Sequence, residues 1–116
     1  MNAAPAQVVL YAKLDGSIPL ADWLRGLRDR TARQKIEIQI ARIRTGNFGL
    51  HRNLGEALFE LKVDCGPGYR LYGSRVGLAI VLLICGGDKR TQSADIQSAR
   101  AYLDDYRRRA AAGRRS

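Results

Sequence analysis

The segment Gly66-Pro67-Gly68-Tyr69-Arg70-Leu71-Tyr72 predicts a tight turn followed by a strand. The apolar run Leu78–Cys85 predicts a second strand, which ends in Gly86-Gly87-Asp88-Lys89-Arg90-Thr91-Gln92. Antiparallel strands with a short connection bring the start of the first beside the end of the second. We therefore expect Arg70 to share a sheet edge with Lys89 and Arg90. Converging cations without a cluster of His or Cys favour a polyphosphate backbone over a metal or a small apolar ligand.

The preceding residues, Leu58–Val63, alternate between two faces with the period of a strand. In ordinary hairpin register, Lys62 and Arg70 then project from neighbouring strands onto one face, and Tyr72 lies two residues further on. The alternative is that these cations are solvated strand residues paired with acids such as Glu60. For Arg70 together with Lys89 we favour the functional interpretation.

Such a cationic face has a specific chemical use. Guanidinium and ammonium groups stabilise the charge that builds on phosphorus when a ribose 2′-oxygen attacks the adjacent phosphate, and this needs no metal. Proton transfer would then come from a perturbed Lys, a Tyr, or an Arg that acts by charge. The only histidine, His51, is expected in a loop beside Arg52, where it is either solvated or in contact with a phosphate.

The remaining elements follow from local patterns. Residues 7–13 predict a first strand, and a short helix should follow with Ser17 as its N-cap. A second helix is expected from about Asp29 to Thr45. Within it, residues 36–40 alternate like a strand, but Ala32, Ile36, Ile40 and Ile43 have helical spacing and helix-forming neighbours. We therefore predict helix.

A closing helix is expected over Asp95–Arg108, with Ile96, Ala99, Leu103 and Tyr106 as its buried stripe. Residues 107–116 are basic and predict a disordered tail. The whole chain, 1–116, is expected to form one domain without repeats.

Composition narrows the class of function. The net charge is +9, and sixteen of the twenty basic residues are Arg. Arginine grips phosphate bidentately and stacks on bases, which favours nucleic acid, although a GC-rich genome would also enrich it. Cys65 and Cys85 suit neither a metal site nor a disulfide framework, so a reducing cytoplasm is expected. The N-terminal residues lack the features of a signal peptide, and the longest apolar run is too short to span a membrane.

The chain resembles RelE/ParE-superfamily toxins of type II toxin–antitoxin modules, and among them the phage-derived, HigB-like "addiction module killer protein" branch. The resemblance covers roughly residues 8 to 106. The segments that carry it are Trp23–Asp29, Ile40–Gly49, Glu60–Lys62, Gly66–Tyr72, Leu83–Gln92, Asp95–Ile96 and Ala99. The ordered set is specific, although no single segment is decisive.

The resemblance implies an α+β, RelE-like fold: an antiparallel sheet of about four strands, two N-terminal helices packed on one side of it, and a C-terminal helix. It also implies ribosome-dependent mRNA cleavage without a cofactor, and inhibition by a cognate antitoxin, expected to be a helix-turn-helix DNA-binding protein. The catalytic residues it implies are Arg70, Lys89, Arg90 and Lys62. The RNA-binding residues expected beside them are Arg52, His51, Tyr72, Arg42 and Arg44.

One departure affects the mechanism. RelE proper has a catalytic tyrosine in the last helix region, and the aligned residue here is Ile96. This places the weight on the cations, or on Tyr72 as a substitute. Two alternative functions stay open: a non-catalytic, ParE-like inhibitor of DNA gyrase, and a plain nucleic-acid-binding protein. The cationic edge favours the nuclease, because an inhibitor that only binds protein does not need it.

Overall fold

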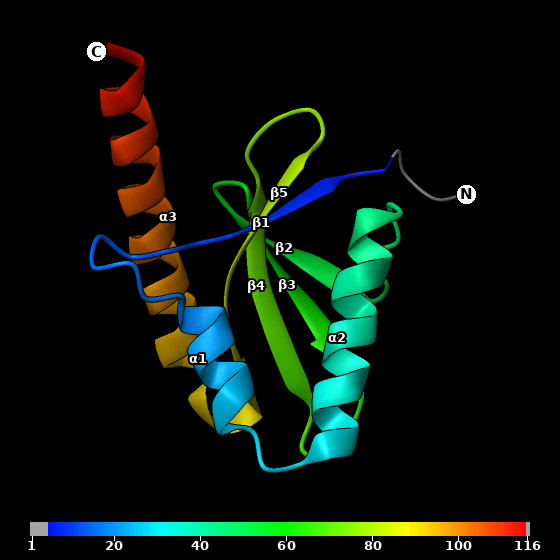
Figure 1. Cartoon of the computed structure of the whole chain (residues 1–116). Helices are drawn as coiled ribbons and strands as arrows, with labels where there is room; N and C mark the ends of the chain where they lie inside the picture. The colour runs from blue at the N-terminus through cyan, green and yellow to red at the C-terminus, as the bar shows by residue number, and fades with distance from the viewer. Residues whose placement is uncertain (1–4, 116) are drawn as a thin grey trace.

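The computed structural model describes residues 5–115 and has an α+β fold (Figure 1). Residues 1–4, on which part of the signal-peptide prediction rests, and Ser116 lie outside the described residues. A 3-10 turn, Lys89–Thr91, joins the last strand to the last helix. The other elements are β1 (Gln7–Leu10), α1 (Pro19–Gly26), α2 (Arg30–Arg44), β2 (His51–Gly55), β3 (Leu58–Val63), β4 (Tyr69–Arg75), β5 (Ile80–Asp88) and α3 (Gln92–Arg115).

The strands form one five-stranded sheet in the order β1-β5-β4-β3-β2. The strands from β2 to β5 are antiparallel to their neighbours, whereas β1 pairs with β5 in parallel. The prediction of about four antiparallel strands is therefore corrected to five strands in a mixed sheet. The extra strand is β2, whose residues were expected to form a loop, and the parallel pair joins segments far apart in sequence.

Helices cover both faces of the sheet. Helices α1 and α2 pack on one face, around a core that includes Leu20, Ile36 and Leu61. Helix α3 packs on the other face, where Ala99 and Leu103 contact a second core with Leu82. Strand β5 is buried from both sides, as its apolar sequence predicts.

Helix α2 settles the conflict in its own sequence. Ile36 and Ile43 are fully buried, whereas Ile38 is 53% exposed, which is the pattern of a helix and not of a strand. The helix begins after Asp29, whose carboxylate accepts a hydrogen bond from the backbone of Ala32. The N-cap prediction for the preceding helix was wrong: residue 18 precedes α1, and the Ser17 hydroxyl donates to Asp15 instead.

Helix α3 is longer than predicted. The prediction of a disordered tail is wrong for residues 107–115, because they are helical. Several arginines there have structural partners. Arg109 donates to the Asp105 carboxylate and to the backbone oxygen of Ala12, and Arg107 donates to the backbone oxygen of Glu56. These bonds and the helix-forming Ala and Arg residues account for the extension.

The glycine pair at the end of β5 allows helices to approach the sheet closely. A Cβ atom on Gly86 would lie 2.4 Å from the ring of Trp23 in α1. A Cβ atom on Gly87 would lie 1.8 Å from a carboxylate oxygen of Asp95 in α3. The pair therefore fixes both helices at the strand end from which Lys89 and Arg90 follow.

Candidate functional site

A hollow of about 470 Å³ opens on the α3 face of the sheet, beside the first turn of that helix. It is lined by Leu50, His51, Arg52, Glu60, Lys62, Arg70 and Gln92. Strands β2, β3 and β4 supply three of its cations, one each. The hollow therefore concentrates positive charge around a concave surface.

The strand register explains why these side chains meet. Lys62 is paired with Arg70, which confirms the predicted juxtaposition of these two residues. In the same sheet Glu60 lies between Arg52 on β2 and Tyr72 on β4. Because alternate residues of a strand share a face, all five belong to the α3 side of the sheet.

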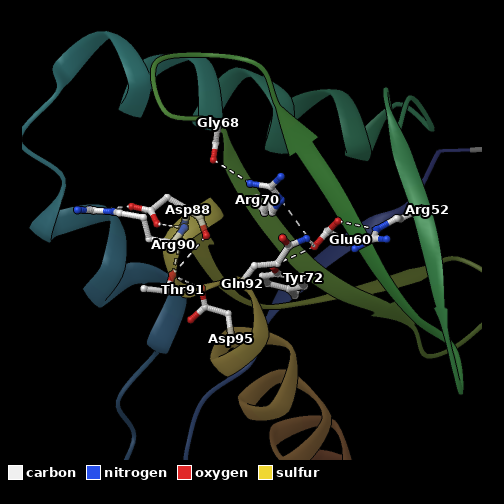
Figure 2. A network of polar contacts seen from close by, with 10 residues as sticks. All are labelled: Arg52, Glu60, Gly68, Arg70, Tyr72, Asp88, Arg90, Thr91, Gln92 and Asp95. Carbon is white, nitrogen blue, oxygen red and sulfur yellow. Dashed lines mark hydrogen bonds and ion pairs between the residues drawn. The ribbon is translucent and has the colours of Figure 1, made fainter.

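Glu60 is at the centre of the polar contacts, as Figure 2 shows. Its carboxylate is only 5% exposed and accepts hydrogen bonds from Arg52 Nε at 2.8 Å, Gln92 Nε2 at 2.8 Å and the Tyr72 hydroxyl at 3.1 Å. Arg70 Nε lies 3.8 Å from the same carboxylate, as an ion pair. A buried charge with this many partners is fully compensated.

These contacts also set the protonation of the group. Burial alone would raise the pKa of Glu60, but the hydrogen bonds from Arg52, Gln92 and Tyr72 lower it below its ordinary value. Burial and the neighbouring Glu60 charge raise the pKa of Tyr72. At neutral pH the pair is therefore a carboxylate and a neutral phenol.

Arg70 is held in one orientation. It is 9% exposed, and its Nη1 donates to the backbone oxygen of Gly68 at 3.1 Å. Gly66 and Gly68 both have positive φ, which places that carbonyl in the tight turn predicted from the sequence. The turn and Glu60 therefore fix the guanidinium from two sides.

Lys89 and Arg90 are only partly where the sequence placed them. Strand pairing sets Arg70 opposite Gly87, so the backbone of the 3-10 turn does follow the predicted sheet edge. The guanidinium of Arg90, however, pairs with Asp88 at 3.0 Å and points away from Arg70 (Figure 2). Neither Lys89 nor Arg90 lines the hollow. For Arg90, the contacts of its backbone and its guanidinium with Asp88 explain this difference.

The predicted RNA-binding residues divide into two groups. Arg52 and His51 line the hollow, and the Nδ1 atom of His51 lies 3.1 Å from the backbone oxygen of Gly49. Tyr72 is fully buried beneath it, which corrects the expectation that its side chain contacts RNA or replaces the family tyrosine.

Arg42 and Arg44 lie in the last turn of α2, the helix that covers the opposite face of the sheet. Arg42 borders a second, smaller hollow that also includes Lys62 and Asp64. Lys62 thus borders both hollows, and the structure does not bring Arg42 or Arg44 into the first one.

Two polar residues of the hollow, Glu60 and Gln92, were not predicted to function. Glu60 was considered only as a pairing partner, and Gln92 only as part of a matching segment. A signal for Glu60 exists in the sequence, because it shares a strand face with Lys62 and lies two residues away. Its burial and its contact with Gln92 depend on where α3 begins, which the local pattern does not reveal.

Within residues 5–115, no group of three His, Cys, Asp or Glu side chains is placed to hold a metal ion. In the same part of the chain, no helix is long and apolar enough to cross a membrane.

The fold and the hollow together define an α+β protein with a buried carboxylate among cations. The chain matches no protein-family model. Over 83 residues it is 42% identical to an uncharacterized protein of Haemophilus influenzae (strain ATCC 51907 / DSM 11121 / KW20 / Rd). The aligned region covers 72% of this chain and 84% of the Haemophilus protein. The chain therefore belongs to the same family as the Haemophilus protein.

Proposed function

We propose that this protein is the toxin of a type II toxin–antitoxin module, with a RelE-like fold, and that it cleaves mRNA on the ribosome. The observation that carries the proposal is the hollow in which Arg52, Lys62 and Arg70 converge from three adjacent strands. The resemblance to HigB-like toxins supports it, because two of the segments that carry the resemblance contribute Lys62 and Arg70 to that hollow.

In the proposed reaction, a phosphate of the RNA backbone occupies the hollow. The ribose 2′-oxygen forms a bond to phosphorus as its proton leaves, the bond to the 5′-oxygen breaks, and that oxygen takes up a proton. Arg70 and Lys62 stabilise the charge that builds on the phosphate oxygens. The products are a 2′,3′-cyclic phosphate and a 5′-hydroxyl.

Neither Tyr72 nor the residue at position 96 in the last helix is suited to act as a catalytic tyrosine. The hydroxyl of Tyr72 is committed to Glu60, and Ile96 packs partly buried against the core under α3. Among the side chains of the lining, His51 carries the imidazole, a group that can both accept and donate a proton. We therefore propose that the cations stabilise the charge on the phosphate. His51 or water then accepts the proton of the 2′-hydroxyl and supplies one to the 5′-oxygen.

The proposed partners follow from the charge and the resemblance. With a net charge of +9, the free toxin binds RNA in the cytoplasm unless a cognate antitoxin masks it. A helix-turn-helix antitoxin with an acidic or amphipathic segment would associate with the toxin quickly at low salt. The association rate should fall as the salt concentration rises, because salt screens the attraction between opposite charges. A pull-down of tagged protein from its host tests this; absence of a small protein encoded beside it would contradict the toxin–antitoxin assignment.

Two other functions are separated by one set of assays. A ParE-like inhibitor would block DNA gyrase and leave RNA intact, and a plain nucleic-acid-binding protein would do neither. The cations in the hollow favour the nuclease. Purified protein is incubated with mRNA on ribosomes, with naked RNA, and with gyrase and supercoiling substrate. The proposal expects cleavage in the first reaction and unchanged gyrase activity in the third.

A further inference from the structure

Glu60 is an unusual residue to find in the proposed RNA site. A carboxylate repels phosphate, yet this one lies in the lining of the hollow, between Arg52 and Arg70. If the hollow only had to attract RNA, a neutral residue at this position would serve better. The carboxylate must therefore contribute something other than affinity.

Its contacts indicate what that is. Oε1 accepts from Arg52 Nε, whereas Oε2 accepts from Tyr72 and Gln92 and faces Arg70 Nε at 3.8 Å. Both arginines thus meet Glu60 through Nε. This leaves the terminal nitrogens of Arg52 unused by Glu60, and one terminal nitrogen of Arg70 is fixed by the oxygen of Gly68. A planar guanidinium held in this way has a defined direction.

We propose that Glu60 is a positioning residue: it orients the guanidinium groups of Arg70 and Arg52 toward the scissile phosphate, and it weakens RNA binding in doing so. The inference rests on the proposed function. It adds that one residue of the site, Glu60, raises the cleavage rate while it lowers the affinity for RNA. Preorganised donors stabilise a transition state more than a ground state, so their orientation acts mainly on the rate.

The same contacts argue against Glu60 as the general base. Each of its oxygens already accepts at least one hydrogen bond, and those bonds favour the charged form. The group is 5% exposed, beneath the cations that would meet the substrate first. Its action is therefore exerted through the arginines.

The test is Glu60→Gln, which keeps the size of the side chain and removes the charge. The new amide also directs a donor at Arg52 or at Gln92, so the arginines lose their fixed direction. We expect cleavage of ribosome-bound mRNA to become at least roughly tenfold slower. Binding of a short non-cleavable RNA with 2′-O-methyl riboses should become at least roughly threefold tighter, because one negative charge that repels phosphate is removed and a buried charge is screened less than one in water.

The matched control is Glu37→Gln, which removes the same charge from an exposed position on α2, behind the sheet. It should leave both the rate and the affinity unchanged. Equal cleavage by wild type and Glu60→Gln, or weaker RNA binding by that variant, would overturn the inference. If the wild type itself does not cleave, the proposed function fails, and the inference fails with it.

A second variant decides the matter if Glu60→Gln does not fold. Tyr72→Phe keeps the ring in the core and withdraws one hydrogen bond from Glu60. Because the hydroxyl is buried and cannot contact RNA, a cleavage rate reduced roughly threefold at unchanged RNA affinity supports the positioning role. An unchanged rate overturns it.

Discussion

Replacing Arg70 with Ala should abolish most of the cleavage activity and also destabilise the fold. The sequence alone predicts that this change removes growth inhibition and leaves the fold intact, because it places Arg70 on a polar face whose truncation leaves no cavity. The structure adds an expected loss of stability: Arg70 is 9% exposed, and truncation removes its hydrogen bond to Gly68 and its ion pair with Glu60. Glu60 keeps three other hydrogen bonds, so the chain should still fold.

The two magnitudes can be estimated separately. Loss of one charge-assisted hydrogen bond and one ion pair lowers the free energy of unfolding by about 2 kcal/mol. For a domain of this size that corresponds to a melting temperature lower by roughly 8 °C. Loss of a donor that acts on the transition state lowers the cleavage rate by about 10² to 10³.

Thermal unfolding and ribosome-bound mRNA cleavage are measured on the same preparations, at a temperature where the variant is folded. Arg108→Ala is the control, because it removes the same charge from an exposed position, and 16 residues of helix, about 24 Å, separate it from Gln92. Full activity of folded Arg70→Ala would refute the assignment of this residue. If Arg70→Ala and Arg108→Ala lose the same amount of activity, the effect of Arg70 comes only from the net charge of the protein and not from its position in the hollow.

Three further outcomes are expected. Gly87→Ala should lower the free energy of unfolding by about 1–3 kcal/mol in chemical denaturation, because its Cβ would overlap Asp95, whereas Gly26→Ala, with no atom within 4 Å, should not. The pKa of Glu60 is lowered in the folded state, so its stabilising contribution is complete above pH 4.5 and is lost as the pH falls through the folded pKa; unfolding measured against pH should show a weaker acid dependence in Glu60→Gln. Protein pre-treated with chelator and returned to the magnesium that ribosomes need should cleave at an unchanged rate, and a restored activity that follows only an added transition metal would contradict this.

The parts of the fold that the sequence predicts correctly are those set by local rules. The Gly66–Gly68 turn fixes the hairpin, and the hairpin fixes the pairing of Lys62 with Arg70. The helical spacing of isoleucines in α2 outweighs a short alternating stretch, because only the helix buries Ile36 and Ile43 together.

The parts that were missed depend on contacts between distant segments. Strand β2, His51–Gly55, has few β-branched or aromatic residues, and it forms because the edge of β3 accepts it. The parallel pairing of β1 with β5 has no local signal at all. The extension of α3 is supported by Arg107 and Arg109, which bind backbone oxygens of earlier loops.

The candidate site shows the same division. Alternation predicts from the sequence that Lys62 and Arg70 share one face, whereas Arg52 joins them only through strand β2, which the sequence did not predict. The prediction that Arg90 lies beside Arg70 was wrong, because the Arg90 guanidinium forms an ion pair with Asp88, two residues away. The burial of Tyr72 and the central position of Glu60 follow from the docking of α3, a tertiary contact that a local pattern does not contain.

The most direct test of the account is the chemistry of the RNA ends. Purified protein is added to ribosomes programmed with a defined mRNA, and the fragments are analysed by mass spectrometry. The account predicts cleavage that requires the ribosome, with a 2′,3′-cyclic or 3′-phosphate on one fragment and a 5′-hydroxyl on the other. Intact mRNA, or fragments that end in a 3′-hydroxyl and a 5′-phosphate, would contradict a 2′-oxygen attack stabilised by the cations of the hollow.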